Sequence, residues 1–285
     1  MTIAALVAQA RERLIAGGVP PDEAPGDAEV LARHALGWDL TQYATGRRDT
    51  PPADFLAQYE SLIARRLTRE PVSQIVGHRE FWGLDFEVTR DVLTPRPETE
   101  LVVQAALDAS PRDRPLVIVD VGTGSGCIAI ALAAELPRAR LIASDVSAAA
   151  LAVARRNAAR HGVSQRIAFL HSRLLNPETD VDLIVSNPPY IPAGDAASLA
   201  PEVREHEPHV ALFGGTDGLD AYRALFTTNQ SSFCAGTDGR LIVEVGYDQA
   251  ARVRAIAEQR SWTFVRGYRD LQEVERVLVF KAKNR

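Results

Sequence analysis

Beyond Pro97 the sequence alternates between short apolar runs and longer segments of helical periodicity, and this alternation limits the possible folds more than any other feature. Apolar strands separated by helices predict an α/β fold, in which a mainly parallel sheet has helices on both faces. Seven strands are expected, over 116–121, 141–145, 167–170, 181–186, 241–245, 262–265 and 277–280. Ligands of such sheets bind at the carboxyl ends of the strands, so the residues that follow each strand are the candidates for a functional site.

The first 75 residues have a different, wholly helical pattern. Apolar residues recur at spacings of three and four, as in Leu6, Ala10 and Leu14, and pairs of glycine or proline separate the segments. Residues 79–88 alternate around Gly83, which predicts two short strands joined by a turn. We therefore expect three parts: a small helical domain for substrate recognition over 1–75, a β-hairpin linker over 76–95 and the α/β domain over 96–285.

Composition and charge exclude several classes of protein. The only cysteines, Cys127 and Cys234, are far apart and have no His or Cys at metal spacing, so we expect neither a disulfide framework nor a metal site. The net charge of −5 gives no basic excess of the kind that nucleic-acid-binding domains have. No apolar stretch has the length of a membrane span, and the first residues do not resemble a signal peptide. We expect a cytoplasmic protein without a membrane or direct nucleic-acid partner.

A glycine-rich loop follows the first expected strand. The segment Asp120-Val121-Gly122-Thr123-Gly124-Ser125-Gly126 lies between a strand and a helix, where glycines allow a ligand to approach the backbone closely. The dinucleotide fingerprint requires its third glycine at position 127, which is Cys127. The loop instead resembles the S-adenosylmethionine loop of class I methyltransferases, and this resemblance implies their Rossmann-like domain.

The next two strands end in further candidate cofactor ligands. Asp145 closes the second strand, where a carboxylate can accept both ribose hydroxyls of a nucleoside. After the third strand, class I methyltransferases often have an acidic residue near the adenine, but this chain has Arg173, so we expect the adenine contact to come from backbone near Leu174. The predicted cofactor-binding residues are Asp120, Gly122, Thr123, Gly124, Ser125, Gly126, Asp145, Leu174 and Asn187.

The fourth strand opens into the turn Asn187-Pro188-Pro189-Tyr190. Neither proline has an N–H, so this turn offers hydrogen-bond acceptors and almost no donors. An NH₂ group suits it: the Asn187 side-chain oxygen and the Pro188 carbonyl can each accept one hydrogen, while Tyr190 stacks on the plane of the group. We predict Asn187, Pro188 and Tyr190 as catalytic residues, and these three with Pro189 as the substrate-binding residues.

This turn also predicts a mechanism. A conjugated nitrogen is a weak nucleophile, and positioning it about 3 to 3.5 Å from the methyl group, in line with the sulfur, lowers the barrier by several kcal/mol. The two acceptor oxygens then stabilise the positive charge that develops on nitrogen. No general base or metal is required. The turn alone leaves glutamine amides, adenine N6 and cytosine N4 as possible substrates.

Segments on both sides of the turn narrow this choice. Thr94-Pro95-Arg96-Pro97-Glu98-Thr99-Glu100 precedes a helix, and the segment 207–219, Glu-Pro-His-Val-Ala-Leu-Phe-Gly-Gly-Thr-Asp-Gly-Leu, follows the turn. With the turn and the helical N-terminal domain, they resemble the PrmC/HemK family of release factor glutamine methyltransferases over nearly the whole chain.

The resemblance implies N5-methylation of the glutamine in the Gly-Gly-Gln loop of class 1 peptide chain release factors, with S-adenosylhomocysteine as the other product. Two alternatives remain open. The sister family that methylates a glutamine of a ribosomal protein has a similar turn but usually differs after Arg96. An adenine-N6 methyltransferase would need a basic groove for a flipped base, and the sequence does not indicate one.

Three other clusters have simpler interpretations. Arg65, Arg66 and Arg69 could contact a partner, but we expect them to form a solvated helix face. His206 and His209 do not have the spacing of a zinc protease helix, so we do not expect them to bind a metal. Cys127 is expected to be a small buried packing residue rather than a nucleophile.

Overall fold

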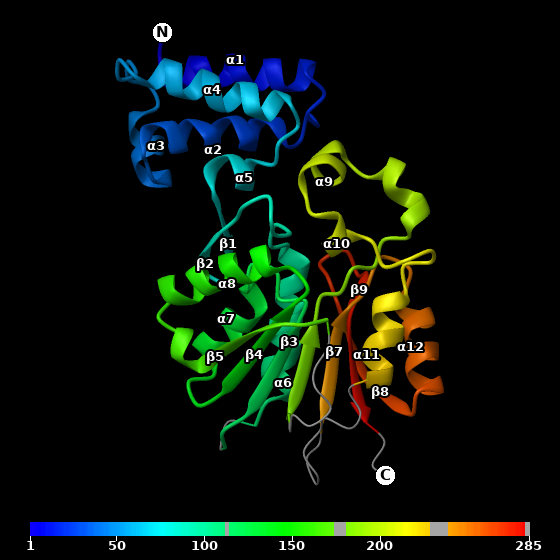
Figure 1. Cartoon of the computed structure of the whole chain (residues 1–285). Helices are drawn as coiled ribbons and strands as arrows, with labels where there is room; N and C mark the ends of the chain where they lie inside the picture. Colours follow the sequence, from blue (N-terminus) through cyan, green and yellow to red (C-terminus); the bar gives the residue numbers. More distant parts are fainter. Residues whose placement is uncertain (112–113, 174–180, 229–238, 283–285) are drawn as a thin grey trace. The chain divides into compact units, whose positions relative to one another are not determined.

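The computed structural model describes residues 1–111, 114–173, 181–228 and 239–282, which form two units (Figure 1). Unit 1 comprises Met1–His78 and Ala200–His206, and unit 2 comprises Arg79–Leu199 and Glu207–Arg285. The chain therefore passes between the units three times, after His78, Leu199 and His206. Within the described residues, no helix is long and apolar enough to cross a membrane.

Unit 1 is helical. Its helices are α1 (Ile3–Ala16), α2 (Ala24–Leu36), α3 (Leu40–Gly46), α4 (Phe55–Leu67), α5 (Val72–Val76) and α9 (Pro201–His206). Leu14, Leu31, Phe55, Tyr59 and Ile63 are buried in its core, and the Tyr59 hydroxyl donates a hydrogen bond to the Ala28 carbonyl. The apolar spacing seen in the sequence is thus the spacing of the residues that pack between α1, α2 and α4.

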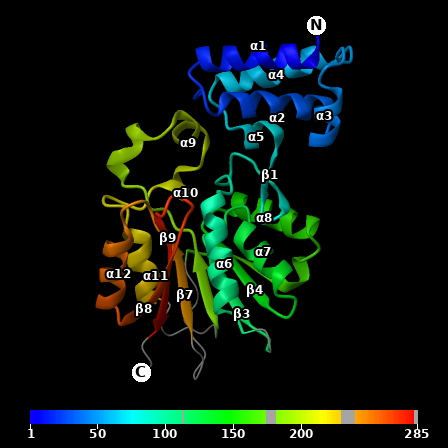
Figure 2. The ribbon, with the colours of Figure 1, turned by 180° about the vertical axis from the view of Figure 1, so that it is seen from behind.

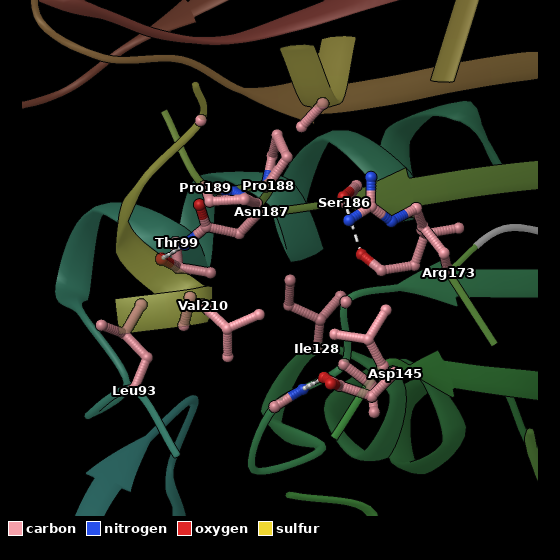
Figure 3. Close-up of a pocket in the computed structure, with 18 of the residues that line it drawn as sticks. Leu93, Thr99, Ile128, Asp145, Arg173, Ser186, Asn187, Pro188, Pro189 and Val210 are labelled. Carbon is pink, nitrogen blue, oxygen red and sulfur yellow. Dashed lines mark hydrogen bonds between the residues drawn. The ribbon is translucent and has the colours of Figure 1, made fainter. Parts of the chain in front are cut away.

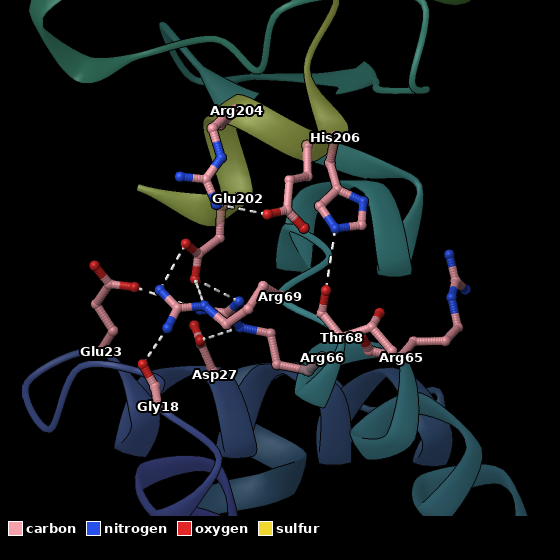
Figure 4. A network of polar contacts seen from close by, with 11 residues as sticks. Gly18, Glu23, Asp27, Arg65, Arg66, Thr68, Arg69, Glu202, Arg204 and His206 are labelled. Carbon is pink, nitrogen blue, oxygen red and sulfur yellow. Dashed lines mark hydrogen bonds and ion pairs between the residues drawn. The ribbon is translucent and has the colours of Figure 1, made fainter. Parts of the chain in front are cut away.

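Three arginines on α4 and just after it overturn one expectation. Arg65, 43% exposed, does belong to a solvated pair with Glu70, but the Arg66 side chain is only 2% exposed. Its guanidinium donates to Asp27 at 2.7 Å and to Glu202 at 2.8 Å, and Arg69 pairs with Glu202 at 2.6 Å (Figure 4). The prediction of a solvated face was wrong because the acidic partner on α9 is more than 130 positions away in the sequence.

Unit 2 contains a seven-stranded sheet, as predicted, in the order β5-β4-β3-β6-β7-β9-β8. The first five of these strands are parallel, and β9 runs antiparallel to β7 and β8. The strands are β3 (Val117–Val121), β4 (Arg140–Asp145), β5 (Ile167–His171), β6 (Leu183–Ser186), β7 (Arg240–Glu244), β8 (Trp262–Arg269) and β9 (Glu275–Ala282). A separate hairpin consists of β1 (His78–Phe81) and β2 (Leu84–Glu87).

Both faces of the large sheet are buried at its central strands β3, β6 and β7. Along β3, Ile118 belongs to the core cluster shared with α6 (Glu100–Ala109) and α7 (Cys127–Glu135), whereas Val119 belongs to the cluster shared with α11 (Asp220–Thr228) and α12 (Ala250–Gln259). Figures 1 and 2 show these helices from opposite sides of the sheet. Apolar side chains are needed on both faces, which explains the continuous apolar runs in the sequence.

The remaining elements of unit 2 are short, apart from α8 (Ala148–Arg160). They are η1 (Pro97–Thr99), η2 (Ser164–Arg166), η3 (Ala193–Ser198) and α10 (His209–Leu212). The strand order reverses beside β3, because the chain runs outward through β4 and β5 and then returns to β6 on the other side of β3. Such a switch point leaves a crevice at the carboxyl ends of the two strands. The glycine loop follows β3 and the Asn187 turn follows β6.

Candidate active site

A cavity of about 330 Å³ opens at this switch point (Figure 3). Its volume lies at the lower end of the roughly 300 to 1,000 Å³ of small-molecule sites. The glycine loop, the end of β4 and the Asn187 turn contribute to its lining, together with residues of the segments 93–99 and 210–225. In Figure 3, Asn187, Pro188 and Pro189 lie on one side, with Ile128 and Asp145 across the cavity from them.

The glycine loop has the conformation that a close ligand requires. Gly122, Gly124 and Gly126 all have positive φ, at 75°, 55° and 84°. A Cβ atom at Gly122 or Gly124 would meet no protein atom within 4 Å, whereas one at Gly126 would lie 2.9 Å from Ile130 Cδ1. The first two glycines therefore leave open space beside the cavity, and the third lets the start of α7 approach Ala154 of α8, which would lie 3.1 Å from the added Cβ.

The Asp145 carboxylate is oriented by backbone N–H groups. Gly124 N donates to Oδ2 at 2.9 Å, and Ser147 N donates to Oδ1 at 2.8 Å. A carboxylate has about four acceptor positions, so each oxygen can accept a further hydrogen bond from a ligand hydroxyl. This arrangement suits a ribose diol and supports the predicted role of Asp145.

Asp120 lies under the loop. It is fully buried, and its Oδ2 accepts a hydrogen bond from Thr123 Oγ1 at 2.6 Å. Burial raises the pKa of this carboxyl to about 7. Asp120 therefore shapes the loop from below, and among the described residues neither Asp120 nor Gly126 lines the cavity.

The raised pKa predicts how an Asp120→Asn variant will respond to pH. A buried carboxyl with a raised pKa keeps its proton in the folded state after the unfolded chain has lost it, so the stability it supplies declines as the pH rises from about 4 to 7. Asparagine does not ionise. From pH 5 to pH 8 this group should lower the free energy of unfolding of wild type by about 1 to 3 kcal/mol. The variant should lack this loss. Urea unfolding at the two pH values measures this difference, and equal pH dependence in both proteins would contradict it.

The Asn187 turn packs tightly against the segment that follows it in the sequence. A Cβ atom at Gly214 would lie 2.4 Å from the Pro189 carbonyl oxygen, and one at Gly218 would lie 2.3 Å from that of Tyr190. Gln249 Nε2 donates to the Tyr190 carbonyl at 2.8 Å. Gly214 and Gly218 are thus glycines because the backbone of the turn leaves no room for a side chain at either position.

The side chain of Tyr190 packs beside the core cluster of β7 and α11. Burial and the nearby Glu244 raise the pKa of its hydroxyl to about 12, so it is neutral at physiological pH. Among the described residues that line the cavity, Tyr190 does not appear. Its stacking on a substrate stays a prediction.

Asn187 is connected to two buried residues from distant parts of the chain. Its Nδ2 donates to Thr99 Oγ1 at 3.1 Å (Figure 3), and Thr99 Oγ1 donates to Glu244 Oε2 at 2.7 Å. Thr99 and Glu244 are each only 3% exposed. Burial raises the pKa of Glu244 to about 7. Asn187 itself is half-buried and lines the cavity.

The Thr94–Glu100 segment is fixed by Glu207. The Thr94 N–H donates to Glu207 Oε1 at 3.3 Å, and Arg96 Nη2 donates to Glu207 Oε2 at 2.7 Å. Further along, Glu100 Oε1 accepts a hydrogen bond from the Trp82 N–H. These contacts order the cavity wall and explain why the two segments that flank the turn in the family pattern contain these residues.

The structure places most of the predicted site residues together. Those that line the cavity are Gly122, Thr123, Gly124, Ser125, Asp145, Asn187, Pro188 and Pro189. Leu174 lies outside the described residues, but the preceding Arg173 does line the cavity. Cys127 is buried and borders the cavity, and burial raises the pKa of its thiol to about 12, which fits a packing role. The described residues contain no group of three or more potential metal ligands.

Sequence reasoning gave no role to Thr99 or Glu244, nor to the apolar wall residues Leu93, Val210 and Phe213. Glu244 did have a signal: it is the one charged residue in the apolar run 241–245, and a carboxylate in a buried strand requires a partner. The sequence could not identify that partner as Thr99, which is 145 positions away.

Two known family models match separate parts of the chain. Residues 5–77 match the model of the PrmC N-terminal domain, and residues 99–203 match that of the methyltransferase small domain. The hMettl16 catalytic domain has a similar fold, with a TM-score of 0.59 at 16% identity over 78% of this chain and 82% of that one. A methyltransferase from Pyrococcus furiosus has a TM-score of 0.52 at 16% identity over 76% of this chain and 96% of its own.

Curated sequences are more closely similar. A release factor glutamine methyltransferase from Cereibacter sphaeroides is 46% identical over 93% of both chains. Proteins of the same description from Caulobacter vibrioides and Agrobacterium fabrum are 40% and 39% identical. The alignments cover 95% and 98% of this chain, and 93% and 97% of those proteins.

Proposed function

The chain belongs to the release factor glutamine methyltransferase family, and from this premise we propose how it selects and methylates its substrate. It is an S-adenosylmethionine-dependent enzyme that methylates a glutamine of release factors. We propose the side-chain amide nitrogen (N5) of the Gly-Gly-Gln loop of class 1 peptide chain release factors as the methylated atom. The acceptor-rich Asn187 turn at the cavity edge is the observation that supports this choice most directly.

The residues present suit S-adenosylmethionine. The glycine loop leaves room for a ligand beside its backbone, Asp145 offers acceptors for a ribose diol, and Ile128 and Val146 add apolar lining. When bound, S-adenosylmethionine supplies a methyl group on a positively charged sulfur. We propose that Gly122, Thr123, Gly124, Ser125 and Asp145 contact it, and that Asp120 and Gly126 act by holding the loop in place.

The protein's own contribution to the reaction is orientation. The Asn187 side-chain oxygen and the Pro188 carbonyl each accept one hydrogen of the glutamine NH₂ group, and this fixes the direction of the nitrogen lone pair. As positive charge develops on nitrogen, the same two oxygens stabilise it. Pro189 lines the same cavity and completes the proposed substrate contact, while stacking of Tyr190 on the amide stays a prediction. The methylated amide keeps one of the two hydrogens of the NH₂ group. The other leaves as a proton to solvent, and no ionisable base is required beside the nitrogen.

A methylation assay with several acceptors tests this proposal. The enzyme is incubated with methyl-labelled S-adenosylmethionine and, separately, with a class 1 release factor, a release factor with alanine in place of the loop glutamine, a ribosomal protein mixture and duplex DNA. We expect label only on the release factor that has the glutamine. Label on ribosomal protein or on DNA instead would replace the proposed substrate by one of the two alternatives.

A further inference from the structure

We propose that Thr99 and Glu244 are positioning residues for methyl transfer: Glu244 orients the Thr99 hydroxyl, and Thr99 holds the Asn187 side-chain amide with its oxygen toward the cavity. This inference rests on the proposed function, because it explains how the turn presents an acceptor rather than a donor. An asparagine amide has nearly the same shape when its oxygen and its NH₂ group exchange places. The turn therefore selects a donor group of the substrate only if a neighbouring residue fixes the orientation of the Asn187 amide.

The hydrogen-bond count determines the orientation. A threonine hydroxyl has one hydrogen to donate, and Thr99 donates it to Glu244 Oε2 at 2.7 Å. Toward Asn187 the hydroxyl can therefore only accept, and the group that donates to it at 3.1 Å is Nδ2. The side-chain oxygen of Asn187 is left for the cavity, where a substrate NH₂ group can donate to it.

Burial makes this arrangement strong. Both Thr99 and Glu244 are 3% exposed, so water cannot replace either of them as a partner. Turning the Asn187 amide over would direct its oxygen at the lone pairs of a hydroxyl that has no second hydrogen, and a buried contact between two acceptors is costly. Three separate segments, η1, the turn after β6 and the end of β7, meet at this point.

The consequence is selection between the two ends of the substrate amide. Glutamine also has a nitrogen and an oxygen of similar size. An acceptor at Asn187 binds the NH₂ end and disfavours the carbonyl end, so the nitrogen lies nearest the methyl donor. With the Asn187 amide free to turn over, part of the enzyme would present an NH₂ group instead and bind the substrate amide the wrong way round.

The kinetic test uses Thr99→Val, which keeps the shape of the side chain and removes its hydroxyl. Loss of a whole transition-state hydrogen bond costs about 10²- to 10³-fold in kcat, and since the amide still adopts the productive orientation part of the time, we expect a loss of about 10- to 100-fold. The affinity for S-adenosylmethionine should stay unchanged. The assays are run at pH 8.5, where Glu244 is ionised because its pKa is about 7. An ionised carboxylate can only accept a hydrogen bond, so the Thr99 hydroxyl must be its donor in wild type.

Two further variants separate positioning from loss of stability. Thr99→Ser restores the hydroxyl and should recover most of the rate. Tyr222→Phe removes a buried hydrogen bond of 2.9 Å to the backbone carbonyl of Glu244 and leaves the Asn187–Thr99–Glu244 contacts intact, so it should lower stability and retain kcat. If Thr99→Val keeps the wild-type kcat, or if Tyr222→Phe loses as much kcat as Thr99→Val, the inference is overturned.

A measurement without substrate tests the orientation itself. The chain has five asparagines, so the side-chain signal of Asn187 in protein labelled with ¹⁵N-asparagine can be assigned by its loss in Asn187→Ala. In wild type we expect one slowly exchanging amide proton, which should exchange quickly in Thr99→Val. Equal exchange in the two proteins would overturn the inference even if the enzyme methylates release factors. Slow exchange in wild type with no methylation of release factors would instead reject the proposed substrate alone.

Discussion

Replacement of Asn187 by alanine is expected to reduce the methylation rate of release factor by at least about 10²- to 10³-fold, the usual effect of removing one hydrogen bond that stabilises developing charge. The variant lacks the acceptor oxygen that orients the glutamine nitrogen. It also leaves Thr99 without the donor that contacts it at 3.1 Å. S-adenosylmethionine affinity should change little, because the glycine loop and Asp145 provide most of the proposed cofactor contacts.

Single-turnover kinetics with saturating cofactor and calorimetric titration of S-adenosylmethionine measure the two effects separately. Asn187→Asp is the matched control, because it keeps an acceptor oxygen of the same reach but replaces the NH₂ group that donates to Thr99. It should retain more activity than alanine and less than wild type. A kcat of Asn187→Ala close to that of wild type would show that the turn does not hold the substrate amide.

The second large effect is on stability, in unit 1. Arg66→Ala is expected to destabilise this unit by about 3 to 5 kcal/mol, because removing one partner of a buried ion pair leaves the other charge uncompensated. Arg66 is 2% exposed and contacts Asp27, Glu202 and, at 3.4 Å, Glu23. Burial alone would raise the pKa of Glu202, but hydrogen bonds from Arg69 and Arg66 outweigh it and hold this pKa below its usual value.

Hydrogen exchange in the full chain, followed for α2, α4 and α9, reports the loss where it occurs. Arg65→Ala is the control on the same helix: Arg65 is 43% exposed and Glu70 21%, and partly exposed pairs of this kind contribute about 0 to 1 kcal/mol. The buried ion-pair interpretation predicts faster exchange in all three helices of Arg66→Ala and near wild-type exchange in Arg65→Ala. Similar behaviour of the two variants would refute it.

The segment that contains Glu202 is continuous in sequence with the residues of unit 2 on both sides. Residues 200–206 leave unit 2 shortly after the Asn187 turn, join unit 1, and return at Glu207, which fixes Arg96 and Thr94 beside the cavity. Within unit 1, Glu202 of this segment pairs with Arg66 and Arg69.

Local patterns were sufficient to predict much of the fold. The apolar run before Asp120 predicted strand β3 correctly, because helices cover both faces of the sheet at this strand and its side chains are buried on each face. The expected seven strands and the hairpin are all present. The boundaries differ by a few residues, most for β8, which continues to Arg269. Strand ends depend on hydrogen bonds to neighbours, which a single segment does not reveal.

The sequence by itself determined the chemistry available at the site: a turn at Asn187 and Pro188 with acceptor oxygens and few backbone N–H donors, a glycine loop open to a ligand, and a carboxylate at Asp145. These properties are local, because they follow from missing N–H groups, missing side chains and the end of a strand. Tertiary structure alone decided that Asp120 lies beneath the loop, that Arg66 is buried against Glu202, and that Thr99 and Glu244 fix the Asn187 amide. Each of these depends on contacts between residues far apart in the chain, and the energy of a buried polar group is set by which partner it meets when the protein folds.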